Sequence, residues 1–417
     1  MLGCCRSPPP AYHTMPLDPL PQPYALLLPS PPSGSFNDLR AAYEQSLSTV
    51  YLKLSQALNG ANTVALLDIA IDIPGLLSSA IPRSKVFASL QRLLANIYKL
   101  VCTVCASRNI ELDGPTGIDT RVIFVDDDPA HSSTVPDLGP IISLEVLAAS
   151  ARKWDSVFYV DSTAGKALLE DFTSHLSPLA QTRYSANTHA VPGGQDGTSS
   201  EPLLGSDDGQ SQSLNYSVAV GGTFDHLHIG HKLLLTATAL ALDSVQGPDL
   251  GKERLITIGV TGDALLVNKK YVEYLEGWDE RVQNTASFLA AVMDFSPAES
   301  SAPSTEWVSD PGPNGKYVLM KLRPDLSLKF VQLSDPCGPT VTDESIDALV
   351  VSAETRGGGK LINDERAKKG WKALEVFEVD VLLSGEVAAA TGVDSKSFGS
   401  KISSTDIRRH RMELARR

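Results

Sequence analysis

Apolar and polar residues alternate along the first half of the chain with two different periods. Residues 38–58 place apolar side chains three and four positions apart, which predicts an amphipathic helix. Shorter apolar runs rich in Val, Ile and Phe predict strands between the helical segments. The predicted strands cover 63–72, 120–128 and 156–162, and further helices cover 142–154 and 164–176. Strands that alternate with helices indicate a parallel sheet, so residues 36–182 are predicted to form an α/β domain.

A second α/β pattern follows in residues 216–417. A strand is predicted at 216–222, and the next helix is predicted to begin at His228 or Ile229 and to end near Leu242. Further strands are predicted at 254–261, 326–335, 346–354 and 373–383, and further helices at 278–295, at 361–371 and after 406. This order predicts a second α/β domain with a parallel sheet, preceded by the separate first one.

Three segments lack the periodicity of helices and strands. Residues 1–35 are rich in proline and contain no apolar run typical of a signal peptide, so they are predicted to be a disordered tail. Residues 183–215 contain many Gly, Ser and Asp residues, which predicts a flexible linker between the domains. Residues 296–315 are polar and rich in Pro and Ser, which predicts an inserted loop.

Composition and charge narrow the class of protein. The chain of 417 residues is 42% hydrophobic and 20% charged, which is ordinary for a globular protein of two or more domains. Its formal net charge of -13 argues against a nucleic-acid or anionic-membrane surface, because such surfaces depend on Lys and Arg. No run of ~18 consecutive apolar residues occurs, so no membrane span is predicted. The cysteines number five, an odd count, so a reducing cytoplasm is the simplest expectation.

Two groups of candidate metal ligands in the first half receive a structural interpretation. Cys102 and Cys105 form a CxxC pair in an apolar segment, but a zinc ribbon would need a second pair, so we expect buried helix cysteines. Asp126, Asp127 and Asp128 follow a predicted strand, which is more typical of a solvated loop than of a metal site. We predict no metal site in the chain and a structural or regulatory role for the N-terminal domain.

The clearest candidate chemistry lies in the stretch GGTFDHLHIGH, residues 221–231. Gly221 and Gly222 end a predicted strand and allow the backbone to approach a bound group closely, and a helix N-terminus then offers N–H donors to an anion. His228 and His231 are three positions apart, so their rings emerge on the same side of the first helical turn. Phosphate handling is the favoured interpretation. Ordinary helix-start histidines and a metal site are the alternatives, although no third metal ligand is evident.

A second candidate anion site lies in KISSTDIRRHR, residues 401–411. Ser403, Ser404 and Thr405 can cap a helix and direct hydroxyl and N–H groups at an anion, and Arg408 lies one turn further along. The alternative interpretation is a capped basic helix exposed to solvent.

These two stretches resemble motifs of the nucleotidyltransferase superfamily. Residues 223–231 are similar to its (T/H)xGH region and residues 403–408 to its ISSTxxR signature. The resemblance implies a Rossmann-like domain with a parallel sheet in which His228 and His231 stabilise charge on nucleotide phosphates. It also implies that the second motif grips the β- and γ-phosphates. The implied nucleotide-binding residues are Gly221, Gly222, Thr223, Phe224, Ser403, Ser404, Thr405 and Arg408.

The segments between the motifs resemble phosphopantetheine adenylyltransferases, most closely the eukaryotic, fungal-type enzymes. Within residues 259–282, Lys269 is the closest match to the lysine that contacts the acceptor phosphate and the nucleotide. Within residues 335–366, Arg356 matches an arginine that faces the nucleotide. The departures are Cys337, where an aromatic residue is common, and the long 296–315 segment.

The resemblance covers residues 216–417 and implies a specific activity. AMP would be transferred from ATP to 4'-phosphopantetheine, giving dephospho-coenzyme A and pyrophosphate, with Mg²⁺ arriving bound to ATP. We further expect association with other enzymes of coenzyme A biosynthesis. A fragment that begins near Leu214 is expected to fold and to retain activity, because the preceding linker is predicted to be flexible.

Other functions remain as alternatives. A cytidylyltransferase shares the HxGH motif, but no RTEGIS-type segment occurs in this chain. An aminoacyl-tRNA synthetase would be expected to carry a basic tRNA-binding surface, which the net charge of -13 disfavours. A non-catalytic nucleotide-binding scaffold is the alternative from another class, and the intact histidines and serine cluster argue against it.

Overall fold

The computed structural model describes residues 21–416 with several gaps. The gaps are 60, 62, 78–81, 113, 115, 128–137, 195–202, 204–212, 246–248, 250, 298–299, 301, 313–314 and 383–401. Most of the predicted linker therefore lies outside the described residues, as do Asp128 and the first 20 residues of the predicted tail.

The first half of the chain forms a six-stranded sheet, here called the N-terminal sheet. Its strand order is β4-β3-β2-β1-β5-β6, and every neighbouring pair is parallel. The strands are β1 (Gln22–Leu28), β2 (Ala65–Asp72), β3 (Ile118–Asp126), β4 (Ile141–Ser143), β5 (Ser156–Val160) and β6 (Thr188–Val191). The helices are α1 (Phe36–Ala57), α2 (Arg83–Arg108), α3 (Leu144–Ala149), α4 (Thr163–Ser174) and α5 (Pro178–Ser185).

The second half forms a seven-stranded sheet, here called the C-terminal sheet. Its strand order is β13-β12-β7-β8-β11-β10-β9. The strands are β7 (Ser217–Gly222), β8 (Arg254–Thr261), β9 (Ser304–Gly312), β10 (Gly315–Arg323), β11 (Leu326–Leu333), β12 (Ala348–Ser352) and β13 (Glu375–Val379). The main helices are α6 (Ile229–Leu240), α7 (Trp278–Met293), α8 (Arg356–Lys368) and α11 (Ser404–Ala415). The chain is thus an α/β protein in which parallel pairing predominates.

Three segments that the sequence analysis predicted to be irregular contain strands in the structure. β1 lies inside the predicted tail and at the centre of the N-terminal sheet, where it pairs with β2 and β5. Its apolar run Tyr24–Leu28 is flanked by prolines, and Pro23 is tolerated because it stands at the start of the strand. β6 lies inside the predicted linker. The predicted 296–315 loop instead contributes β9 and the start of β10, an antiparallel pair that makes the C-terminal sheet mixed.

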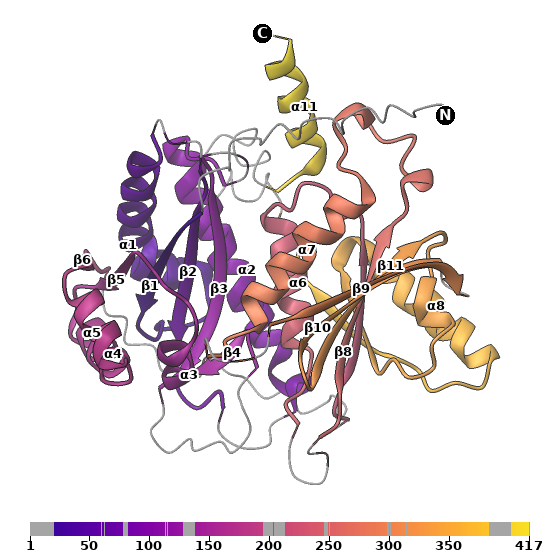
Figure 1. Cartoon of the computed structure of the whole chain (residues 1–417), viewed down its shortest axis with the longest axis horizontal. Helices are drawn as coiled ribbons and strands as arrows, with labels where there is room; N and C mark the ends of the chain where they lie inside the picture. Colours follow the sequence, from indigo (N-terminus) through magenta and orange to yellow (C-terminus); the bar gives the residue numbers. More distant parts are fainter. Residues whose placement is uncertain are drawn as a thin grey trace, which may run out of the picture.

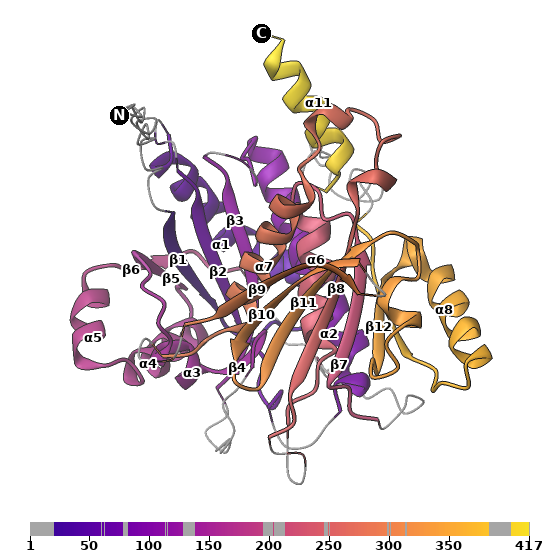
Figure 2. The same ribbon diagram turned by 45° about the vertical axis from the view of Figure 1, so that its right-hand side comes forward.

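The two sheets share one hydrophobic core. Helices α2, α6 and α7 lie between them, α8 covers the far face of the C-terminal sheet, and α11 projects at one end (Figures 1 and 2). Val101 of α2 belongs to the same buried cluster as Leu233 of α6 and Phe288 of α7. The rings of Phe87 and Phe377 also meet across the interface, with centroids 4.6 Å apart.

Polar contacts reinforce this interface at both ends. The amide of Arg83, at the start of α2, donates to the Asp243 carboxylate at 2.8 Å. The guanidinium of Arg152 donates to the Ala291 carbonyl of α7 and stacks on the ring of Phe295 at 4.0 Å. Because buried backbone and side-chain groups bond across the boundary, separating the halves would leave donors and acceptors without partners.

Three candidate metal ligands in the first half of the chain, Cys102, Cys105 and Asp126, are buried and contribute to packing or to hydrogen bonds within the fold. Cys102 and Cys105 are buried on α2, as predicted. The prediction of a solvated loop is wrong for Asp126, which is 2% exposed and accepts hydrogen bonds from the amides of Gly75 at 3.0 Å and Leu77 at 2.6 Å.

Among the described helices, none combines the length and apolar character needed to cross a membrane.

The shared core reverses our expectation for a fragment that begins at Leu214. Large apolar side chains each contribute roughly 1.5–3 kcal/mol when buried, so exposing several on α6 and α7 is comparable to the ~5–15 kcal/mol stability of a whole domain. We predict that residues 214–417 alone aggregate or unfold without a cooperative transition in calorimetry. Coexpression with residues 1–213 is the control, and the two pieces should copurify. A cooperative transition of the fragment at the temperature of the full chain would contradict the prediction.

Candidate functional site

The candidate site begins where β7 ends and α6 starts. His228 caps the N-terminus of α6, and its Nδ1 accepts a hydrogen bond from the His231 amide at 3.4 Å. In the connecting loop, Phe224 and His226 have φ values of 52° and 47°, a region that non-glycine residues rarely occupy. The local sequence therefore forms the predicted strand, glycine turn and helix, with a strained loop between strand and helix.

His228 and His231 stack on each other. Their ring centroids are 3.8 Å apart and their planes differ by 18°. Burial, together with the neighbouring charges, lowers the pKa of His228 well below its ordinary value, and burial lowers the pKa of His231 to about 4. Both rings are therefore neutral near pH 7, and an anion placed beside them would favour their protonated forms.

Helix α11 docks on the loop before α6 through a buried carboxylate. Arg408 is 2% exposed and donates to the Asp225 carboxylate, to the Lys270 carbonyl at 3.0 Å and to Thr405 Oγ1 at 3.2 Å. The Ser404 hydroxyl donates to the Asp225 carbonyl at 2.8 Å. The structure thus brings together the two motifs singled out in the sequence, but Arg408 is engaged in a buried ion pair.

The contact between the motifs is close at the first turn of α6. A Cβ added to Gly230 would lie 3.2 Å from the His228 ring and 3.7 Å from the Ile402 carbonyl. Ser403 caps α11 and accepts a hydrogen bond from the Asp406 amide at 3.3 Å. The first turn of α6 therefore lies beside the start of α11, where each helix N-terminus can offer N–H donors to an anion.

Sequence reasoning missed a buried network around His226 and Glu276. The His226 amide donates to Glu276 Oε2 at 2.8 Å, and the Glu276 amide donates to Asp225 Oδ1 at 3.0 Å. Burial alone would lower the pKa of His226, but the hydrogen bond to Glu276 and the charge of Asp225 raise it. His226 stands in the same motif stretch as the other two histidines, but it precedes the helix and the sequence analysis did not single it out.

Arg281 completes this network from α7. Its fully buried guanidinium donates to the Thr223 carbonyl at 2.7 Å, to the Glu276 carbonyl at 3.0 Å and to Asp263 Oδ1 at 2.5 Å. It therefore holds Thr223, one of the predicted nucleotide-binding residues, and the unusual loop conformation that follows it.

One group of side chains could hold a metal ion. Ligand atoms of Asp225, His226 and Glu276 lie within 4.8 Å of one another, and no second group of this kind occurs in the described part of the chain. The Asp225 carboxylate already accepts from Arg408 and from the Glu276 amide. A cation would therefore have to compete with a buried arginine, which makes the group better suited to fixing the loop.

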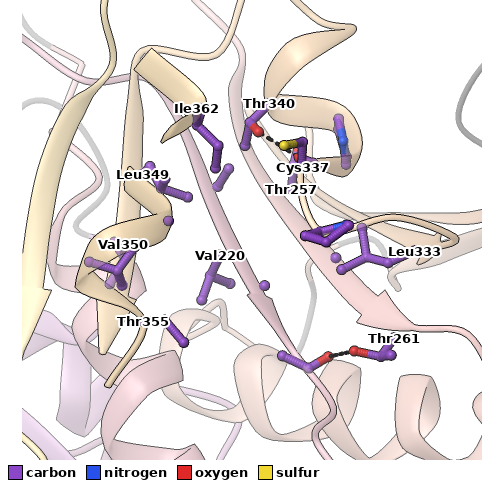
Figure 3. Close-up of a pocket in the computed structure, with 18 of the residues that line it drawn as sticks. Val220, Thr257, Thr261, Leu333, Cys337, Thr340, Leu349, Val350, Thr355 and Ile362 are labelled. Carbon is purple, nitrogen blue, oxygen red and sulfur yellow. Dashed lines mark hydrogen bonds between the residues drawn. The ribbon is translucent and has the colours of Figure 1, made fainter. Parts of the chain in front are cut away.

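A cavity of about 330 Å³ opens beside the glycine turn. Figure 3 shows apolar side chains such as Val220, Leu333 and Val350 around it, with Cys337 and Thr340 close together in its wall. Gly221 and Gly222 line it at the carboxyl end of β7. A Cβ on Gly222 would lie 2.9 Å from the Phe224 ring, so the turn requires glycine there. Cys337, which departs from the family pattern, thus lines this cavity. Burial raises the pKa of its thiol.

Lys269 and Arg356 are both exposed at the surface of this structure. Lys269 is exposed on the segment that follows β8. The Arg356 side chain is 69% exposed and pairs with Glu378 of β13, with Nε 2.6 Å from Oε2. Its neighbour Thr355 lines the cavity. Neither cation contacts His228 or His231 in any hydrogen bond or ion pair of the described residues.

Comparison with known proteins separates the chain into an unassigned part and a recognisable one. Residues 15–196 match a family described as "Domain of unknown function (DUF8446)". An uncharacterized protein of Schizosaccharomyces pombe is 33% identical over 210 residues, which are 50% of this chain and 52% of that protein. A protein of Saccharomyces cerevisiae named phosphopantetheine adenylyltransferase is 35% identical over 191 residues, which are 46% of this chain and 47% of that protein. The chain thus spans about half the length of these two fungal relatives.

An archaeal relative is matched over most of its length. The phosphopantetheine adenylyltransferase of Methanopyrus kandleri is 30% identical over 191 residues, which are 46% of this chain and 87% of that protein. The chain therefore belongs to the nucleotidyltransferase family that includes this archaeal protein.

The buried ion pair of Asp225 leads to a stability prediction. Asp225→Ala leaves the Arg408 guanidinium buried without its counter-ion, so we expect the free energy of unfolding to fall by about 3–5 kcal/mol. Arg409→Met on the same helix is the matched control, because Arg409 pairs with Asp406 at the surface at 2.9 Å and should contribute less than about 1 kcal/mol. Urea titrations of both variants measure the difference. Equal stability of the two variants would show that the ion pair is not what holds α11.

Proposed function

We propose that this chain is a pantetheine-phosphate adenylyltransferase, which transfers AMP from MgATP to 4'-phosphopantetheine. The observation that carries the proposal is the stacked pair His228 and His231 at the start of α6, with the start of α11 beside it. Its family membership supports the same activity, as do the relatives from Saccharomyces cerevisiae and Methanopyrus kandleri, which are both named phosphopantetheine adenylyltransferase.

The nucleotide phosphates are assigned to the meeting point of the two helices. The imidazoles of His228 and His231 are neutral and only partly buried. They can therefore donate hydrogen bonds to phosphate oxygens and gain protons as negative charge develops. The hydroxyls of Ser403, Ser404 and Thr405 and the first amides of both helices supply further donors. Arg408 acts on this site indirectly, because its guanidinium is committed to Asp225.

The acceptor is assigned to the cavity beside Gly221 and Gly222. Its volume of about 330 Å³ and largely apolar wall suit an uncharged, flexible pantetheine arm, and its position at the carboxyl ends of parallel strands is the usual place for a ligand. Arg356 would exchange its surface partner Glu378 for a substrate phosphate, which costs little because exposed ion pairs are weak. Lys269, exposed on its segment, would reach the acceptor phosphate.

The reaction needs no protein nucleophile. An oxygen of the acceptor phosphate forms a bond to the α-phosphorus of ATP, the bond between that phosphorus and the α–β bridging oxygen breaks, and pyrophosphate leaves with its magnesium. The protein positions two anions and stabilises the charge that develops between them. We further propose a cytoplasmic location and association with other enzymes of coenzyme A biosynthesis.

A substrate comparison tests the activity. The purified full chain with MgATP should release pyrophosphate only when 4'-phosphopantetheine is present, because the cavity and the phosphate site act together. The measurement is coupled pyrophosphate detection, with dephospho-coenzyme A identified by mass spectrometry. Equal release from CTP with phosphocholine would favour the cytidylyltransferase, and nucleotide binding without any release would favour the scaffold.

Loss of one imidazole tests the site itself. His231→Ala should lower kcat by about two or more orders of magnitude, the usual effect of removing a donor that acts on transition-state charge, with little change in thermal unfolding. His175→Ala, which removes an exposed histidine at the end of α4, is the matched control and should retain full activity. Unchanged turnover of the His231 variant would mean that the histidine pair is structural.

A further inference from the structure

The residue that follows the histidine motif is held by the other sheet. Lys232, directly after His231, is 4% exposed, and its ammonium donates to Asp119 Oδ1 of β3 at 2.7 Å. The two residues are 113 positions apart. A lysine is rarely buried unless it is paired, so the carboxylate of the N-terminal sheet is what allows Lys232 to point inward.

Asp119 is itself fixed on β3. Arg121, two positions along the same strand, contacts Asp119 Oδ2 at 3.2 Å. Burial raises the pKa of Asp119, but the charges of Lys232 and Arg121 outweigh burial and lower it. The carboxylate is therefore ionised at neutral pH, and it stands between two cations, Arg121 of β3 and Lys232 of α6.

A second cavity is lined both by this ion pair and by residues of the candidate site. The cavity measures about 250 Å³ and lies between the sheets. Asp119, Lys232, His226 and Glu276 all line it. Strand β3 thus contacts the first turn of α6 through Lys232, and the His226–Glu276 network faces the same cavity as this contact.

We propose that Asp119 is a positioning residue for the histidine pair, and that the domain of unknown function therefore completes the catalytic unit. By holding Lys232, Asp119 fixes the first turn of α6, which carries His231 and the amides of Ile229 and Gly230. Without the carboxylate, the buried ammonium would turn towards water and move that turn. Displacements of about 1 Å in a prearranged site cost on the order of 100-fold in rate.

The inference rests on the proposed adenylyl transfer and is tested in the full chain. Asp119→Asn should lower kcat about tenfold or more, while the KM values for MgATP and 4'-phosphopantetheine change less than about threefold. Asp119→Glu, which keeps the charge, should restore most of the turnover. Lys232→Met should match Asp119→Asn, and the double variant should be no slower than either single variant, since both remove one interaction.

A contact elsewhere in the same interface provides the control. Gln91 of α2 donates to Asp380 Oδ2, after β13, at 3.3 Å. Asp380→Asn perturbs the interface away from the histidines and should leave kcat unchanged. If Asp119→Asn turns over at the wild-type rate, or if Asp380→Asn loses as much activity, Asp119 has no positioning role. If Asp119→Asn does not fold, Lys232→Met decides in the same way, because the Asp119 carboxylate that it leaves behind is partly exposed and still pairs with Arg121.

Hydrogen exchange separates this inference from the proposed function. Asp119→Asn should speed amide exchange in residues 226–236 relative to the wild type, whereas Asp380→Asn should not. If the wild type transfers no adenylyl group but the exchange differs as expected, the function fails and the positioning role stands. Unchanged exchange together with unchanged turnover overturns the positioning role alone.

Discussion

The buried carboxylate of Asp225 is the constraint on which the candidate site depends. One oxygen accepts from the Glu276 amide and the other from the Arg408 guanidinium, while its backbone carbonyl accepts from Ser404. Three segments distant in sequence are thereby joined behind the start of α6. A charged group with no exposure is costly unless it is paired, so these contacts are made together or not at all. The positions of both helix N-termini follow from this one group.

Burial then determines the chemistry of the two stacked imidazoles. Because they are largely withdrawn from water, they are neutral, whereas His226, only two positions before His228, has a raised pKa beside Glu276. Three histidines within six residues thus divide into one that fixes the loop and whose pKa is raised, and two whose pKa values are lowered and that stand at the helix start. The surrounding cations are committed elsewhere: Arg408 to Asp225, Arg281 to Asp263 and Lys232 to Asp119. A bound polyphosphate would therefore find hydrogen-bond donors arranged in advance, with little reorganisation required.

Local features of the sequence predict much of this arrangement. The strand, glycine turn and helix around residues 216–242 follow from hydrophobic period and turn chemistry, and the start of α11 follows from its cap. Contacts between distant residues could not be predicted in the same way. Asp225 and Arg408 are 183 positions apart, and nothing local indicates that Arg408 is buried. Strand β1 was hidden for another reason, because proline enrichment indicated a tail although the five residues after Pro23 are apolar enough for a central strand.

Contacts between distant residues also define the role of the N-terminal sheet. No catalytic motif was found in its sequence, yet it packs closely against the second half of the chain. A regulatory module attached by a linker would need a polar surface that tolerates separation, as interfaces between mobile domains usually have. Here α2 lies against α6 within a single apolar core, and a buried lysine next to the histidine motif finds its counter-ion on β3. An ion pair placed inside an apolar interface adds little stability compared with an apolar pair, but it specifies one orientation of the two surfaces. That orientation places Asp119 against Lys232, the residue that follows His231, so the geometry of the candidate site and the docking of the N-terminal sheet depend on each other.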